Sequence, residues 1–134
     1  MLTKKAKYAL NALVFLAKQP TSPVRAIEIS KQNNIPSKFL EGILSELVRI
    51  GVLDSQRGQS GGYSFLKDPK DILVVDILRQ FDGAVGLVPC ATHQFFKPCV
   101  ECVDVEACKI RWMFKELRDL SVEFLKNKSI QDLL

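Results

Sequence analysis

Residues 35–66 read IPSKFLEGILSELVRIGVLDSQRGQSGGYSFL, and the rest of the chain is organised around this stretch. Over its first half, apolar residues recur at helical spacing and polar residues fall on the other faces. The apolar positions are Leu40, Ile43, Leu44, Leu47, Val48 and Ile50, and the polar ones are Ser37, Lys38, Glu41, Ser45 and Arg49. Pro36 and Ser37 favour a helix start, and Gly51 favours a helix end. This half therefore predicts a helix with one packed face and one face free to bind.

A glycine-rich hairpin, here called the wing, is predicted directly after this helix. Its strands are expected at residues 52–53 and 63–65, which are rich in residue types that favour strands. Between them, RGQSGG supplies glycines for a tight turn and places Arg57 at its tip. A helix, a stop and a basic hairpin together predict a winged helix-turn-helix, whose helix would lie in a DNA groove.

Helices are also predicted over residues 3–18, 25–33, 72–81 and 105–127. The first has a core-facing stripe of Tyr8, Ala9, Ala12, Leu13, Leu16 and Ala17, and the second is expected to turn Ala26, Ile27 and Ile29 inward. The last carries a heptad seam of Ile110, Met113, Leu117, Leu120 and Phe124. One chain cannot bury such a seam in water, so the seam predicts a homodimer. Residues 129–134 are expected to form a last turn that docks back.

The predicted fold class is therefore mainly α with a small β-hairpin wing. Residues 1–83 would form a winged helix-turn-helix DNA-binding domain, residues 84–104 a cysteine-bearing sensor loop, and residues 105–134 a dimerisation helix and tail. The sensor loop lacks clear periodicity. A connection of that length usually has a function or is disordered.

Charge is distributed unevenly along the chain. Residues 1–67 hold 10 Lys and Arg against 4 Asp and Glu, whereas residues 68–134 hold 9 against 11. The basic half indicates double-stranded DNA as its partner, and a merely solvated basic surface is the alternative. Lys4 and Lys5 begin a helix whose N-terminus would otherwise favour acids, so they are expected to contact phosphates. Because neither a signal peptide nor an apolar run of roughly 18 residues is found, a cytoplasmic protein without a membrane partner is expected.

All four cysteines lie within 19 residues, in the spacing C-x8-C-x2-C-x5-C. They are Cys90, Cys99, Cys102 and Cys108. In a cytoplasmic protein this clustering indicates a metal or redox centre rather than a disulfide framework. Thiolates bind iron-sulfur clusters and structural zinc, but all-cysteine zinc sites more often pair two C-x2-C knuckles. The single knuckle favours an iron-sulfur cluster, with zinc or thiol-disulfide switching as alternatives.

The other residue types with catalytic or ligating chemistry give weaker signals. His93 is the one histidine and lies in the sensor loop, but a lone loop histidine is more often solvated and four thiols already fill the usual ligand number. No Ser-His-Asp set, phosphate-loop motif or carboxylate pair stands in a suggestive context. Enzymatic activity is therefore not expected.

With the wing and the cysteines in place, the chain resembles the winged-helix iron-sulfur cluster regulators, the IscR/NsrR-like transcriptional regulators. The resemblance spans nearly the whole chain and is carried by KYALNAL, PVRAIEIS, IPSKFLEGILSEL, RGQSGGYSFLKDP, the cysteines and KSIQDLL. It implies a homodimer on pseudo-palindromic promoter DNA, with Lys38 and Glu41 reading bases and Arg57 entering the minor groove. The cluster ligands that it implies are Cys99, Cys102 and Cys108.

The chain departs from the family's pattern around the cluster ligands. The interval from Cys99 to Cys102 is shorter than is usual there. Arg111 stands where the family's cluster-assembly regulator has a histidine, and Lys7 stands where its nitric-oxide sensor has a carboxylate. Neither cation can ligate iron in that way, so Cys90 is the expected fourth ligand. All-thiolate ligation favours a low-potential cluster, of either the two-iron or the four-iron type.

The sequence thus predicts a homodimeric DNA-binding transcription regulator whose promoter affinity is controlled by an iron-sulfur cluster. The expected DNA contacts are Lys4, Lys5, Ser37, Lys38, Glu41 and Arg57, and the expected metal ligands are Cys90, Cys99, Cys102 and Cys108. One alternative is a cluster-free winged-helix protein that responds to thiol oxidation, zinc or a metabolite. Another is a metal or redox protein whose winged helix docks on other proteins. The basic wing favours DNA binding over the latter.

Overall fold

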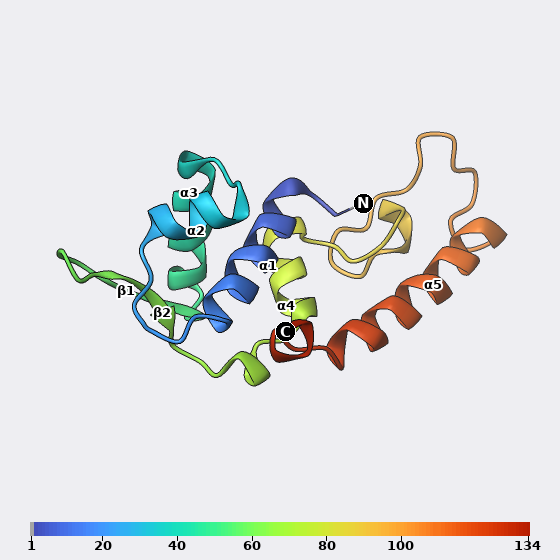
Figure 1. Cartoon of the computed structure of the whole chain (residues 1–134). Coiled ribbons are helices and arrows are strands. Elements are labelled where there is room, and N and C mark those ends of the chain that lie inside the picture. Colours follow the sequence, from blue (N-terminus) through green and yellow to red (C-terminus); the bar gives the residue numbers. More distant parts are fainter. Residues whose placement is uncertain (1) are drawn as a thin grey trace.

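The computed structural model describes residues 2–134 as five α-helices, one two-stranded antiparallel sheet and three short 3-10 helices (Figure 1). The α-helices are α1 (Lys4–Ala17), α2 (Ala26–Asn33), α3 (Ser37–Arg49), α4 (Val74–Asp82) and α5 (Lys109–Lys126). The strands are β1 (Leu53–Gln56) and β2 (Gly62–Phe65), and the 3-10 helices are η1 (Pro69–Asp71), η2 (Pro89–Ala91) and η3 (Gln131–Leu133). The prediction of a mainly α chain with a hairpin wing is confirmed. Met1, the first residue of the predicted DNA-binding domain, lies outside the described residues.

Local signals in the sequence set the helix boundaries around the core. Thr3 caps α1, because its Oγ1 accepts the Ala6 N–H at 3.2 Å. Asn34 ends α2 in the left-handed conformation, with φ at 52°. Gly51 follows α3 with φ at 76°, a conformation that glycine adopts without a Cβ penalty. The tight connections that result place α2 and α3 at an angle against α1.

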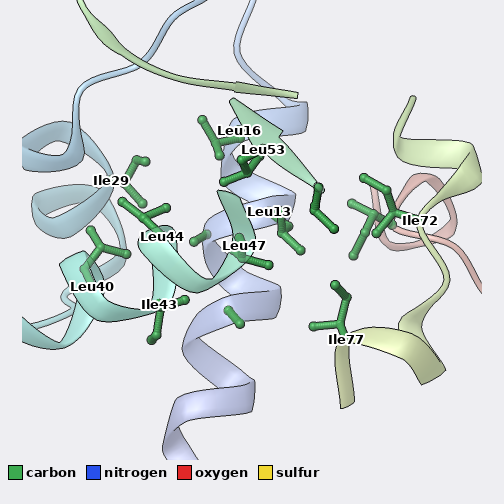
Figure 2. Packing of buried hydrophobic residues seen from close by; sticks show 14 of the residues in the cluster. Leu13, Leu16, Ile29, Leu40, Ile43, Leu44, Leu47, Leu53, Ile72 and Ile77 are labelled. Atoms are coloured by element: carbon green, nitrogen blue, oxygen red, sulfur yellow. The ribbon is translucent and has the colours of Figure 1, made fainter. Parts of the chain in front are cut away.

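The core is built around α1, which packs against α2, α3 and α4. Figure 2 shows the apolar face of α3, from Leu40 to Leu47, turned toward Leu13 and Leu16 of α1, with Ile29 of α2 close by. Leu13, Leu44 and Leu47 are completely buried. The spacing of these residues in the sequence predicted this face, and the structure confirms it. The packed face fixes α3 while leaving its other face at the surface.

Four details of the predicted elements are wrong. The first wing strand is Leu53–Gln56 rather than residues 52–53, because its pairing with β2 continues to Gln56 opposite Gly62. Ile27 is 49% exposed rather than inward, because it lies about 200° around the helix from the buried Ile29. Helix α4 begins at Val74 rather than at residue 72, since Ile72 and Leu73 are extended and pair with the tail. Helix α5 begins at Lys109 rather than at residue 105, because residues 104–107 form a turn capped by a carboxylate.

The wing pairs β1 with β2 in antiparallel register, from Leu53 opposite Phe65 to Gln56 opposite Gly62. A third segment joins its edge. Val24 and Tyr63 exchange two backbone hydrogen bonds, with N···O distances of 2.9 and 2.8 Å. The segment before α2 therefore ties the hairpin to the helical core, a contact that local sequence patterns do not predict.

The chain after α5 returns to the helical core. Ile130 is completely buried and its N–H donates to the Ile72 carbonyl at 2.9 Å. The Val74 N–H in turn donates to the Lys128 carbonyl at 2.8 Å. The expectation that the tail docks back is confirmed, so the C-terminal end of α5 is tied to the start of α4 (Figure 1). Over residues 2–134, no helix has both the length and the apolar character that crossing a membrane would require.

Candidate functional site

The exposed polar face of α3 is the first of two surfaces expected to meet DNA. Lys38 and Glu41 are exposed and lie three residues apart, which places them on one side of the helix. Ser37 is exposed in the first turn, where its Oγ lies 3.3 Å from the Oγ of Ser30 in α2. Helix α3 thus presents a hydroxyl, a cation and a carboxylate from a backbone whose opposite face is fixed in the core.

The wing turn is the second surface. Arg57 is exposed at the start of this turn, directly after β1, rather than at its tip as predicted. The turn projects away from the helices in Figure 1. Gly58 has φ at 106°, where residues with a side chain are strained, and a Cβ on Gly61 would overlap the Gln56 carbonyl. The glycines therefore set the shape of the turn, and Arg57 supplies its cation.

The two lysines at the start of α1 have different surroundings. Lys4 is exposed. Lys5 instead places its Nζ 2.9 Å from Glu46 Oε2 and 5.3 Å from the centre of the Phe81 ring. The contact of Lys4 and Lys5 with phosphates stays a prediction. A phosphate would reach Lys4 without displacing a partner, whereas it would compete with Glu46 for Lys5.

Glu46 of α3 connects three helices through its carboxylate. Its carboxylate in α3 accepts hydrogen bonds from Lys5 of α1 at 2.9 Å and from Gln80 of α4 at 2.7 Å. The bond from Lys5 is the main cause that lowers the pKa of Glu46, with the bond from Gln80 next. The ionised carboxylate therefore fixes α3 relative to α1 and α4.

We expect Glu46→Gln to lower the free energy of unfolding by about 1 kcal/mol at pH 7. A carboxylate whose pKa is lowered by folding stabilises the protein above its ordinary pKa of 4.5, and this stabilisation is lost as the pH falls through the folded pKa. The difference between wild type and variant should therefore shrink in acid. Urea unfolding at pH 7 and at pH 3 measures it, with exposed Glu101→Gln as the matched control. A difference that is unchanged in acid would contradict the ionic role.

The four cysteines lie in three kinds of surroundings. Cys90 is buried in η2, whereas Cys99 is exposed and Cys102 is half-buried in the irregular segment that follows. The Cys102 N–H donates to the Cys99 carbonyl at 3.1 Å, which makes the C-x2-C pair one tight turn. Cys108 is the residue before α5, and its Sγ accepts the Arg111 N–H at 3.4 Å. Residues 90–108, here called the cysteine segment, thus join η2 to α5.

Neighbouring thiols affect the pKa of Cys99. The Cys90 thiol is the main cause that raises the pKa of the Cys99 thiol, and Cys108 acts in the same direction. Within residues 2–134, no group of three or more His, Cys, Asp or Glu side chains is arranged to hold a metal ion. The donor set of adjacent thiols on an irregular, largely exposed segment still fits the chemistry of a cluster or of a disulfide. The four ligand assignments stay predictions.

Two arginines of α5 hold the turn that carries Cys90. Arg111 donates through Nε to the Cys90 carbonyl at 2.9 Å, and Arg118 donates through Nη1 to the Ala91 carbonyl. Arg118 is only 5% exposed, and its Nε and Nη2 donate to Asp119 at 2.8 and 2.6 Å. His93 of the cysteine segment also approaches Asp119, with its Nε2 3.6 Å from the carboxylate. The cysteine segment is therefore bonded directly to α5.

The arginine contacts were not predicted from the sequence. A signal was available in α5, because Phe114, Arg118 and Val122 repeat every four residues and form an inward face beside the heptad seam. The seam itself is open in the single chain. Its side chains, which are Ile110, Met113, Leu117, Leu120 and Phe124, are 43 to 66% exposed. Helix α5 thus has one face on its own chain and one uncovered apolar face.

Known proteins resemble this chain along its whole length. The Rrf2 family, described as iron-dependent transcriptional regulators, matches residues 2–134. An rrf2-like HTH-type transcriptional regulator of Rhodobacter capsulatus is 38% identical, over 100% of this chain and 92% of that protein. The HTH-type transcriptional regulator IscR of Photorhabdus laumondii is 28% identical, over 99% of this chain and 78% of that protein. The structure of CymR, the global cysteine regulator of B. subtilis, has a TM-score of 0.77 at 27% identity, over 99% and 95% of the two chains.

These matches confirm the resemblance to winged-helix regulators of the IscR type and the winged-helix fold. The relatives are named as transcriptional regulators, so the prediction of a regulator rather than an enzyme is also confirmed. A match over residues 2–134 leaves no large part of the chain outside the family. The chain belongs to the Rrf2 family of DNA-binding, winged-helix transcriptional regulators.

Proposed function

We propose that the chain is a cytoplasmic homodimeric regulator whose affinity for promoter DNA is controlled by an iron-sulfur cluster on the cysteine segment. In this proposal residues 1–83 bind DNA, residues 84–104 sense the signal, and residues 105–134 pair two copies. The observation that carries the DNA-binding part is the polar face of α3 beside a projecting basic wing turn. Helices of this kind enter the major groove, where Lys38 and Glu41 would meet base edges, while Ser37 and Lys4 would contact the backbone.

Arg57 would enter the minor groove. An A·T-rich minor groove is narrow and strongly negative, so it attracts an arginine from a projecting turn. Lys5 would have to share its ammonium group between a phosphate and Glu46, to which it is already bonded. Two groups of residues are thus separate. Lys38, Glu41 and Arg57 would read the DNA sequence, and the residues that contact phosphates would raise the affinity for DNA of any sequence.

The cluster would supply a centre that responds to oxidants or to nitric oxide. Cys90, Cys99, Cys102 and Cys108 would hold it, which requires the exposed Cys99-to-Cys102 turn to close on buried Cys90. The Arg111 bond to the Cys90 carbonyl would pass this ordering to α5. Support comes from the thiol donor set and from the similarity to IscR of Photorhabdus laumondii.

A thiol-based regulator without a cluster is the second candidate. The observation that favours it is the set of four free thiols on the cysteine segment, of which Cys99 is exposed to an oxidant. The similarity to CymR, named the global cysteine regulator of B. subtilis, agrees with control by sulfur chemistry. Iron and inorganic sulfide analysis of anaerobically purified protein separates the two candidates, because only the first requires both elements. Bound zinc without sulfide would favour a structural metal instead.

We expect Arg57→Ala to weaken specific DNA binding by about 5- to 150-fold, since a specific arginine contact to DNA contributes on the order of 1–3 kcal/mol. Lys4→Ala is the matched cation-removal variant. It should lower the slope of log affinity against log salt by about one and leave sequence preference unchanged. Fluorescence anisotropy across salt concentrations measures both, with a duplex selected by the wild-type protein and a scrambled duplex. If neither variant alters binding, the DNA-facing surface is wrongly assigned.

A further inference from the structure

One side chain outside the hairpin reaches the wing turn. Arg25, the residue before α2, donates through Nη2 to the carbonyl of Gln59 at 2.8 Å. The two residues are 34 positions apart, and Gln59 lies two residues after Arg57. A charged donor from the helical core is thus bonded to the short turn that carries the wing's cation.

The backbone beside Arg25 gives this contact a fixed origin. Val24 and Tyr63 exchange two hydrogen bonds, so residues 24–25 run along the open edge of β2. Gly62 allows this close approach, because a Cβ there would overlap the Val24 carbonyl and crowd the Arg25 nitrogen. The Arg25 side chain therefore starts from a position that is locked to the base of the wing and ends on its tip.

Among residues 2–134, few other hydrogen bonds hold the wing turn. Inside it, the Gly61 N–H donates to the Gly58 carbonyl at 3.1 Å. Residues 57–60 are exposed, and glycines stand on both sides of Gln59 in the turn. Glycine leaves the backbone more conformations to lose on binding than any other residue. A tether at Gln59 lowers this ordering cost before DNA arrives.

We propose that Arg25 is a positioning residue for DNA recognition, which holds the wing turn so that Arg57 is preorganised for the minor groove. The proposal rests on the DNA-binding function proposed above. A direct phosphate contact by Arg25 is the competing role for an exposed cation at this place. The two roles differ in their dependence on Arg57 and on salt, because a phosphate contact acts independently of the wing.

The test is a double-mutant cycle on the full chain with Arg25→Ala, Arg57→Ala and the double variant. The probe is a duplex that the wild-type protein selects from a randomised library, with a scrambled duplex for non-specific binding. We expect Arg25→Ala to lower specific affinity about tenfold in the wild-type background. In the Arg57→Ala background it should have almost no further effect, and the salt slope should not change. Lys126→Ala, which removes an exposed cation from the end of α5, is the control for net charge.

A second measurement tests, in the absence of DNA, whether the Arg25 bond to Gln59 holds the wing turn. Amide hydrogen exchange across residues 57–62 should rise in Arg25→Ala while circular dichroism and exchange in α1 and α3 stay unchanged. Unchanged exchange in the wing, or equal DNA affinity, would overturn the proposal. An additive loss in the Arg57→Ala background with a salt slope lowered by about one would assign Arg25 to phosphate and also overturn it. Failure of the wild-type protein to select any duplex would instead reject the DNA-binding function itself, and the exchange result would still decide the tether.

Discussion

Replacing Leu117 with Asp is expected to turn the protein into a monomer with greatly reduced affinity for an operator with two half-sites. Leu117 is the middle residue of the apolar seam on α5 and is 43% exposed in the single chain. Pairing of two α5 helices would bury it. A carboxylate buried there without a partner costs several kcal/mol, which exceeds the contribution of any one seam residue. Sedimentation velocity at micromolar concentration measures the change in mass.

Leu66→Asp is the matched control for this experiment. Leu66 is also an exposed leucine, at 62%, but it follows β2 and lies outside α5. The same charge added there should leave the dimer intact. Circular dichroism establishes that both variants are folded, because α5 also contacts α4 and η2. A wild-type protein that sediments as a monomer at micromolar concentration would reject the seam as a pairing surface.

Replacing Cys99, Cys102 or Cys108 with Ala is expected to abolish iron and sulfide binding. It should also remove the difference in operator affinity between reconstituted and apo protein. In the wild-type protein we expect this difference to be about 5- to 150-fold, the ordinary range for coupling between two sites. Cys90→Ala should act in the same way if Cys90 is the fourth ligand. Its burial in η2 adds a risk to folding, which circular dichroism and urea unfolding monitor.

The physical reason for the coupling lies in the bonds between the cysteine segment and α5. Arg111 and Arg118 bond the carbonyls of Cys90 and Ala91, so reordering these residues would shift α5. In a homodimer, two recognition helices would have to meet major grooves about 34 Å apart, so a change at the dimer axis would penalise both half-sites together.

Operator affinity of reconstituted and apo protein, compared at one fixed salt concentration, measures this coupling. His93→Ala is the matched control, because His93 lies in the same segment but its Nε2 faces Asp119 at 3.6 Å. It should leave iron content and affinity unchanged. Equal affinities of the two forms, or a preparation that takes up zinc but never iron and sulfide, would reject control by a cluster.

The helices and the wing could be predicted from the sequence because each follows a local rule. The 3-4 spacing from Leu40 to Leu47 marks the buried face of α3, and the glycines after Arg57 mark the turn. Boundaries that depend on pairing with distant residues were missed. Helix α4 starts two residues after its predicted start because the Ile72 carbonyl bonds to Ile130 in the tail. The sequence of residues 72–81 contains no signal for that distant partner.

In the candidate site, too, features set by local patterns could be predicted and contacts between distant residues could not. The exposure of Lys38, Glu41 and Arg57 follows from helical periodicity and turn position, so it was accessible from the sequence. The bond between Lys5 and Glu46 joins residues 41 positions apart, and the bond between Arg25 and Gln59 joins residues 34 apart. Contacts over such separations depend on how the elements pack, which local patterns do not encode. The ligand arrangement of the cysteines belongs to the same class of tertiary property.

The docked tail would let α5 act as a lever once the bonds of Arg111 and Arg118 to η2 are released. The helix is fixed to the start of α4 by the backbone bonds of Lys128 and Ile130, and its other end carries Cys108. With 18 residues the lever is about 27 Å long, so a tilt of about 5° around the tail joint would move the Cys108 end by about 2 Å. The same tilt would hardly displace the joint itself. A small rotation of α5 at the tail would thus displace the cysteine end of the helix much farther than the tail itself.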